Sequence, residues 1–94
     1  MEKSTHTPEY LALRNLLKKT RVEAGLSQRE MAAKLGTPHS WVAKVENGER
    51  RIDLVEFCWF VAACGVDPLV TFESLRRQTG KSQAARHIKS ARRR

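Results

Sequence analysis

The strongest constraint on this chain is a pair of short helical patterns that follow each other with almost no linker. Residues 27–30 (SQRE) have the spacing of a capping box, in which a serine and a glutamate each satisfy a free backbone N–H group where a helix begins. Gly36 ends this helix, and Thr37 with Pro38 opens the next one as an N-cap followed by a proline. Because only Gly36 and Thr37 separate the two helices, they must cross at a steep angle.

Such a crossing is the arrangement of a helix-turn-helix unit. The second helix is predicted to run from about Pro38 to Glu46, before the turn dipeptide Asn47-Gly48. Ala32 is small enough for the two helices to approach closely. The apolar residues expected between them are Met31, Leu35, Val42 and Val45.

Three further helices are predicted around this pair. The first begins at Pro8, the fourth begins after Asp53, and the fifth begins at Pro68. The sequence therefore predicts an all-α fold, a compact five-helix domain with a basic C-terminal tail. We expect an N-terminal segment at residues 1–7, the helix-turn-helix domain at residues 8–79 and a flexible basic tail at residues 80–94.

The distribution of charge favours a polyanionic partner. The net charge is +8, yet Lys and Arg balance Asp and Glu over residues 1–73. The whole excess lies in residues 74–94, and a basic terminal segment of this kind usually attracts nucleic acid, although it can also serve solubility. The predicted phosphate contacts of the tail are Lys81, Arg86, Lys89, Arg92, Arg93 and Arg94.

Composition and spacing argue against several other classes. No apolar run is long enough for a membrane span, and the first residues lack an apolar signal region, so we expect a cytoplasmic, nucleoid-associated protein. Cys58 and Cys64 lie six residues apart on one predicted helix, too far apart to bridge. The three histidines are scattered, and no catalytic set, metal-ligand spacing or cofactor motif is present. We therefore predict no enzyme activity, no metal and no cofactor.

Residues 13–77 resemble the lambda-repressor-like family of Cro/CI or XRE-type regulators. The resemblance is carried by residues 26–36 (LSQREMAAKLG) and 42–51 (VAKVENGERR). It implies a transcriptional regulator, here a repressor, whose third helix reads double-stranded DNA in the major groove. It also implies a homodimer that binds two half-sites of a palindromic operator about one turn of DNA apart.

The resemblance assigns roles to individual residues. His39, Ser40 and Lys44 are the predicted base-reading side chains. The predicted contacts to the DNA backbone are Gln28, Trp41, Asn47, Arg50 and Arg51. Each of these assignments has an alternative. Trp41 could instead be partly buried against a neighbouring helix, and Gln28 could be a simple exposed residue. Asn47, Arg50 and Arg51 could belong to a solvated loop.

Other charged and aromatic residues are given structural roles. By resemblance, Arg21 and Glu46 are predicted to form an ion pair between the first helix and the end of the third. Arg14, Lys18 and Lys19 are expected to form a solvated face of the first helix. The fourth helix is apolar all round, so either the fifth helix or a second subunit must cover part of it. The candidates for that interface are Trp59, Phe60 and Cys64.

Two other functions are compatible with the sequence. An antitoxin-type protein would use the same fold to bind a partner protein, a toxin, and to regulate its own promoter. Binding of RNA is a third hypothesis, but the glycine and aromatic signatures of the common RNA modules are missing.

Overall fold

The computed structural model describes residues 4–79 of the 94-residue chain. Over that range, five α-helices follow a short 3-10 helix, η1 (Ser4–His6), and no strand is present. The α-helices are α1 (Pro8–Glu23), α2 (Gln28–Leu35), α3 (Ser40–Glu46), α4 (Leu54–Ala63) and α5 (Pro68–Thr79). The prediction of an all-α fold with five helices is confirmed.

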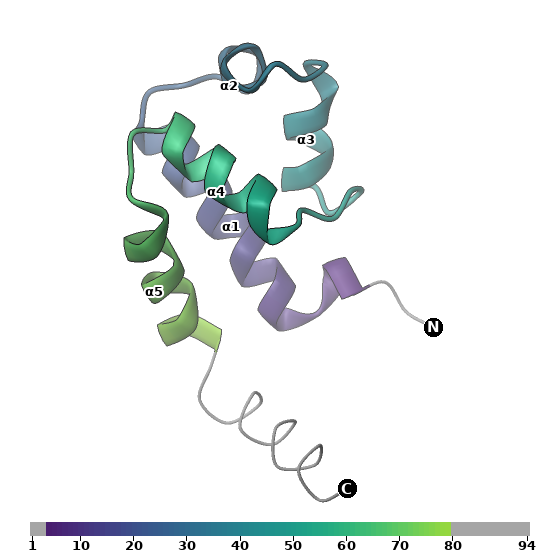
Figure 1. Ribbon diagram of the computed structural model, residues 1–94. Coiled ribbons are helices and arrows are strands. Elements are labelled where there is room, and N and C mark those ends of the chain that lie inside the picture. The colour runs from purple at the N-terminus through teal and green to yellow at the C-terminus, as the bar shows by residue number, and fades with distance from the viewer. Residues whose placement is uncertain (1–3, 80–94) are drawn as a thin grey trace, which may run out of the picture.

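The long helix α1 is the element on which most of the others pack. It contacts α3, α4 and α5, while α2 packs on α3 and α4 (Figure 1). The core between these helices is apolar. Its buried members are Leu17, Met31, Ala32, Val42, Val45, Ile52, Phe57, Phe60 and Val61.

Two capping boxes fix where α2 and α4 begin. The Ser27 hydroxyl accepts a 3.0 Å hydrogen bond from the Glu30 backbone N–H, and a Glu30 carboxylate oxygen accepts one of 2.8 Å from Ser27 N. Asp53 and Glu56 form the same reciprocal pair at the start of α4. Both starts agree with the sequence prediction.

The predicted start of α3 is wrong by two residues. The helix begins at Ser40, and His39 occupies the N-cap position without a capping hydrogen bond from its side chain. The Thr37 hydroxyl donates back to the Ala32 carbonyl at 3.5 Å, and the Pro38 carbonyl accepts from Trp41 N at 2.9 Å in a single turn. Thr37 thus completes the end of α2 and leaves residues 36–39 as the connection.

Gly36 makes this connection sharp. It has a left-handed backbone with φ of 69°, which residues other than glycine rarely adopt. The chain therefore reverses at the end of α2, and α3 packs across α2, as the helix-turn-helix prediction requires.

The fourth helix divides its apolar residues between the core and solvent. Phe57, Phe60 and Val61 are buried, whereas Leu54, Val55 and Trp59 are exposed.

Within residues 4–79 no single helix is long and apolar enough to cross a membrane; only α4 and α5 taken together, bent by 116°, satisfy length and composition.

Candidate nucleic-acid interface

The three predicted base-reading residues lie exposed on α3 or at its N-cap. His39, Ser40 and Lys44 are all exposed. At about 100° per residue, Ser40 and Lys44 lie within about 40° of each other around the helix, and Val42 lies on the opposite side. Val42 and Val45 are fully buried, so core packing turns the polar side chains outward.

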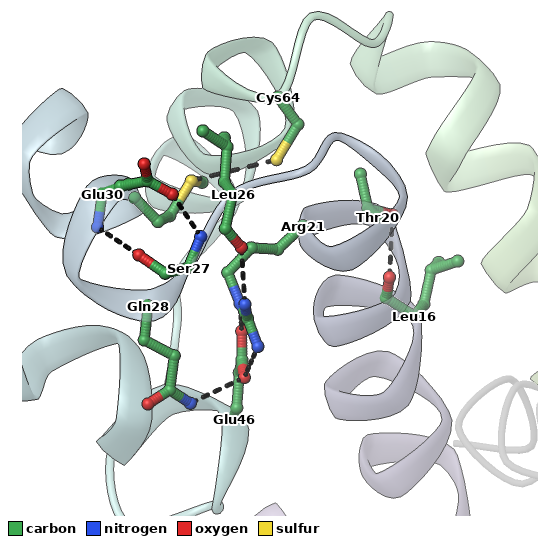
Figure 2. Close-up of polar contacts among 10 residues, drawn as sticks. Leu16, Thr20, Arg21, Leu26, Ser27, Gln28, Glu30, Glu46 and Cys64 are labelled. Carbon is green, nitrogen blue, oxygen red and sulfur yellow. Dashed lines mark hydrogen bonds and ion pairs between the residues drawn. The ribbon is translucent and has the colours of Figure 1, made fainter.

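The end of α3 is held by the predicted ion pair between Arg21 and Glu46, which is confirmed. Arg21 Nε donates to Glu46 Oε2 at 2.7 Å, and the second guanidinium bond reaches Glu46 Oε1 at 3.0 Å (Figure 2). Both side chains are almost fully buried. The hydrogen bond to Glu46 raises the pKa of Arg21 above its ordinary value, so the arginine stays protonated.

Gln28 joins this ion pair from α2. Its Nε2 donates to Glu46 Oε1 at 3.0 Å, and Figure 2 shows the amide oxygen turned away from the carboxylate. Arg21 also donates to the Leu26 carbonyl at 2.7 Å, so the buried guanidinium binds both the end of α3 and the segment that leads into α2. The predicted phosphate contact of Gln28 stays a prediction, with one amide N–H already committed to Glu46.

Arg14 has a role that the sequence interpretation missed. It is only partly exposed, and its Nε donates to the Glu46 backbone carbonyl at 3.0 Å while its terminal nitrogen donates to the Thr5 carbonyl at 3.2 Å. The expected solvated face holds for Lys18 and Lys19 but is wrong for Arg14. The spacing of seven residues between Arg14 and Arg21 places both on the side of α1 that meets α3, and this signal could have revealed it.

The loop after α3 is tied to its surroundings by aromatic and charged groups. Arg51 lies over the Tyr10 ring at 5.1 Å from its centre, and the Tyr10 hydroxyl accepts from Ile52 N at 2.9 Å. Asn47 and Arg51 are both exposed, as a contact to the DNA backbone requires. The two residues are therefore presented by an ordered loop next to α3.

Arg50 and Trp41 are engaged within the protein. The Arg50 guanidinium lies 5.1 Å from the centre of the Trp41 ring and makes two hydrogen bonds to the Glu56 carboxylate, at 3.1 and 3.0 Å. The hydrogen bond from Arg50 is the main cause that lowers the pKa of Glu56, and the same bond raises that of Arg50. Trp41 is half-buried, so both of its predicted environments, a neighbouring helix and the groove wall, stay accessible to it.

The interface candidates on α4 behave differently from one another. Trp59 is 61% exposed and can meet another molecule. Phe60 is fully buried in the core, so its assignment to an interface is wrong: the helix turns this position towards the other buried apolar side chains. Cys64 is half-buried with its Sγ 3.9 Å from Met31 Sδ, and burial raises the pKa of its thiol. It packs against the core more than it faces outward.

The remaining predicted contacts belong to the tail, which lies outside the described residues. They are Lys81, Arg86, Lys89, Arg92, Arg93 and Arg94. Among residues 4–79, no group of three or more His, Cys, Asp or Glu side chains is arranged to hold a metal ion.

The comparisons with known proteins agree with this geometry. Residues 12–71 match a family described as a helix-turn-helix domain. Among solved structures, an XRE-family like protein from Pseudomonas syringae pv. tomato str. DC3000 is similar, with 44% identity and a TM-score of 0.74 over 82% of this chain and 94% of that one. No curated protein matches the sequence.

The fold and the match over residues 12–71 define a helix-turn-helix DNA-binding protein. More specifically, the chain belongs to the XRE-type family of helix-turn-helix regulators.

Proposed function

We propose that this protein is a sequence-specific transcriptional repressor that reads a palindromic operator as a homodimer. The observation that carries the proposal is the state of α3. Its outward side chains are polar and exposed, while its C-terminal end is bound by Arg14, Arg21 and Gln28 through Glu46. A helix held in this way can enter the major groove without reordering.

The proposed base contacts follow from the chemistry of the exposed residues. Lys44 donates to O6 and N7 of guanine, Ser40 bonds several bases, and His39 donates or accepts according to its tautomer. Lys44 lies one helical turn beyond Ser40 on the same side of α3, so the two side chains address neighbouring base pairs.

The proposed backbone contacts surround this helix. Gln28 stands at the start of α2, where free backbone N–H groups and the helix dipole favour a phosphate. Asn47 and Arg51 reach the backbone from the loop after α3. These contacts set the orientation of α3 and carry no sequence information directly.

The proposed mechanism is repression by occlusion of a promoter. A dimer over two half-sites about one turn apart covers enough DNA to exclude other proteins. The homodimer is supported by apolar side chains on the outer side of α4, where Leu54, Val55 and Trp59 are all more than half exposed.

Selection of binding sites from a random duplex DNA pool tests the proposal. The purified protein at two salt concentrations is expected to enrich a palindrome with half-sites about one turn apart. A Lys44→Ala variant is then expected to lose discrimination at one base pair of each half-site, worth about 1–3 kcal/mol.

An alternative result would count against the proposal. Enrichment of no sequence, with affinity that collapses as salt rises, would mean unspecific attraction to phosphate. A Lys44→Ala variant that weakened all duplexes equally would remove Lys44 from the base-reading set.

A further inference from the structure

Arg50 connects two elements that the sequence interpretation did not link. It follows α3 in the chain, yet its guanidinium bonds the Glu56 carboxylate of α4 at 3.1 and 3.0 Å. The same group lies 5.1 Å from the centre of the Trp41 ring on α3. One side chain therefore bridges the second residue of α3 and the first turn of α4.

The carboxylate on which Arg50 rests is itself fixed. Glu56 Oε1 accepts a 3.0 Å hydrogen bond from Asp53 N in the capping box at the start of α4. Arg50 also donates to the Arg51 carbonyl at 2.8 Å. The orientation of the guanidinium is thus set by three hydrogen bonds that do not involve DNA, and its charge is compensated by Glu56 at 3.0 Å.

Trp41 needs this support because core packing does not hold it on all sides. A small cavity of about 80 Å³ lies beside the indole, lined by Leu35, Thr37, Glu56 and Trp59. The Arg50 guanidinium, 5.1 Å from the ring centre, makes a cation–π contact that holds the ring from the loop after α3. Trp41 follows Ser40 directly on α3, so a contact that supports the indole acts on the turn of the helix that carries the exposed Ser40 side chain.

We propose that Arg50 is a positioning residue, which fixes the rotation of α3 through Trp41 and Glu56 and thereby governs sequence discrimination without contacting phosphate. This inference rests on the proposed function of α3 as the base-reading helix. It replaces the sequence-based assignment of Arg50 to the DNA backbone, while Arg51 keeps that assignment.

The substitutions Arg50→Lys and Glu56→Gln separate the two roles. Lysine keeps the charge that a phosphate contact needs but lacks the planar fork and the flat stacking surface. Glutamine keeps the capping box at α4 and removes one negative charge, which would strengthen DNA binding if Arg50 were a phosphate contact that Glu56 restrains.

The measurement compares affinity for the selected operator with affinity for a random duplex over a range of salt. We expect each variant to bind the operator about tenfold more weakly, with affinity for the random duplex and the salt slope unchanged. Arg51→Gln serves as the contrasting variant, because loss of a phosphate contact lowers affinity for both duplexes and reduces the salt slope by about one.

A matched control is available on α5. Glu73 also pairs with an arginine, Arg76, but the two side chains are 43% and 58% exposed, and their helix α5 packs on α1 and α4. Glu73→Gln removes the same charge as Glu56→Gln and is expected to leave the ratio of the two affinities unchanged. An Arg50→Lys variant that binds like the wild type, or a Glu56→Gln variant that binds both duplexes more tightly, would overturn the positioning role.

Amide hydrogen exchange without DNA keeps this inference separate from the proposed function. Residues 41–46 are expected to exchange faster in Arg50→Lys and Glu56→Gln than in the wild type and in Glu73→Gln. If the wild type selects no operator, the proposed function fails and exchange alone decides whether Arg50 holds α3. Unchanged exchange in both variants would overturn the positioning role whatever the DNA result.

Discussion

The Arg14 guanidinium occupies the space beside Gly48 that a side chain at that position would need. A Cβ on Gly48 would lie 2.9 Å from Arg14 Cζ, and Gly48 itself has a left-handed backbone with φ of 78°. The missing side chain lets Arg14 reach the carbonyl of Glu46, the last residue of α3. The turn after α3 and the anchoring of α3 to α1 therefore depend on the same glycine.

Gly48→Ala is expected to destabilise the protein more than the same change at Gly25. Both glycines have φ of 78°, so alanine at either position pays a backbone strain of about 1–2 kcal/mol. Only at position 48 does the new methyl group meet Arg14, because nothing lies within 4 Å at position 25. Loss of the Arg14 hydrogen bond adds about 1 kcal/mol, measured as the difference between the two variants in urea unfolding. Equal losses would mean that Arg14 moves aside without effect.

Glu46→Leu is expected to lower the free energy of unfolding by about 3–5 kcal/mol, because it leaves the buried Arg21 charge without a partner. The side chains of Arg21 and Glu46 are 8% and 2% exposed, so water cannot replace the lost carboxylate. The double variant Arg21→Met/Glu46→Leu is expected to recover much of the loss. Urea unfolding followed by circular dichroism provides the values.

The exposed ion pair on α5 is the control for that prediction. Glu73→Leu removes a carboxylate from a pair with Arg76 that is about half exposed, and the expected change is within about 0.5 kcal/mol. A double variant at 21 and 46 that is no more stable than Glu46→Leu would show that the damage comes from packing and not from an unpaired charge.

Most of the fold and one part of the site could be predicted because they depend on neighbours in the sequence. The capping box at Ser27 and the start of α4 after Asp53 follow from local patterns, and the structure confirms both. The start of α3 could not be predicted correctly because Thr37 can cap forward or bond backward, and its contact with Ala32 decides the outcome. The Arg21–Glu46 pair came from family resemblance, which already contains the tertiary fold.

The parts of the site that could not be predicted involve partners without a sequence pattern. Arg14 binds backbone carbonyls, which every residue carries, so no residue type reveals its partner. Arg50 looked like one more basic residue in a loop, since its partners Trp41 and Glu56 meet only when α3 and α4 are packed. Phe60 was misplaced because a helix that is apolar on all sides has no periodicity to mark its buried face.

Acid is expected to weaken the tie between Arg50 and Glu56. The hydrogen bonds from Arg50 and from Asp53 N lower the pKa of Glu56 below its ordinary value of 4.5. A carboxylate whose pKa is lower in the folded state stabilises the fold fully above about pH 4.5, and this contribution is lost as pH falls through the folded-state pKa. Stability measured by urea unfolding between pH 7 and pH 3 is therefore expected to fall less steeply in Glu56→Gln than in the wild type.

Glu30 offers an internal comparison for this acid response. Its pKa is also lowered, mainly by the hydrogen bond from the Ser27 backbone, so it titrates in the same direction but without an arginine partner. In Glu30→Gln, too, the stability measured by urea unfolding is expected to fall less steeply between pH 7 and pH 3 than in the wild type. Amide exchange in α3 at neutral pH is expected to stay unchanged. If the stability of Glu56→Gln and of the wild type fell equally with falling pH, the assigned cause of the lowered Glu56 pKa would be contradicted.

If the proposed dimer forms through α4, a substitution of Trp59 is expected to weaken dimer formation without destabilising the monomer. Trp59 is 61% exposed, so Trp59→Glu removes little buried area from the monomer and is expected to leave its unfolding midpoint almost unchanged. If α4 forms the interface, a buried tryptophan contributes about 2 kcal/mol or more, and the dimer dissociation constant rises about thirtyfold. Sedimentation equilibrium over a range of protein concentrations gives that constant. Leu69→Glu on α5 is the matched control, because the Leu69 side chain is 73% exposed. If Leu69→Glu abolished the dimer and Trp59→Glu did not, the interface would lie on α5 and not on α4.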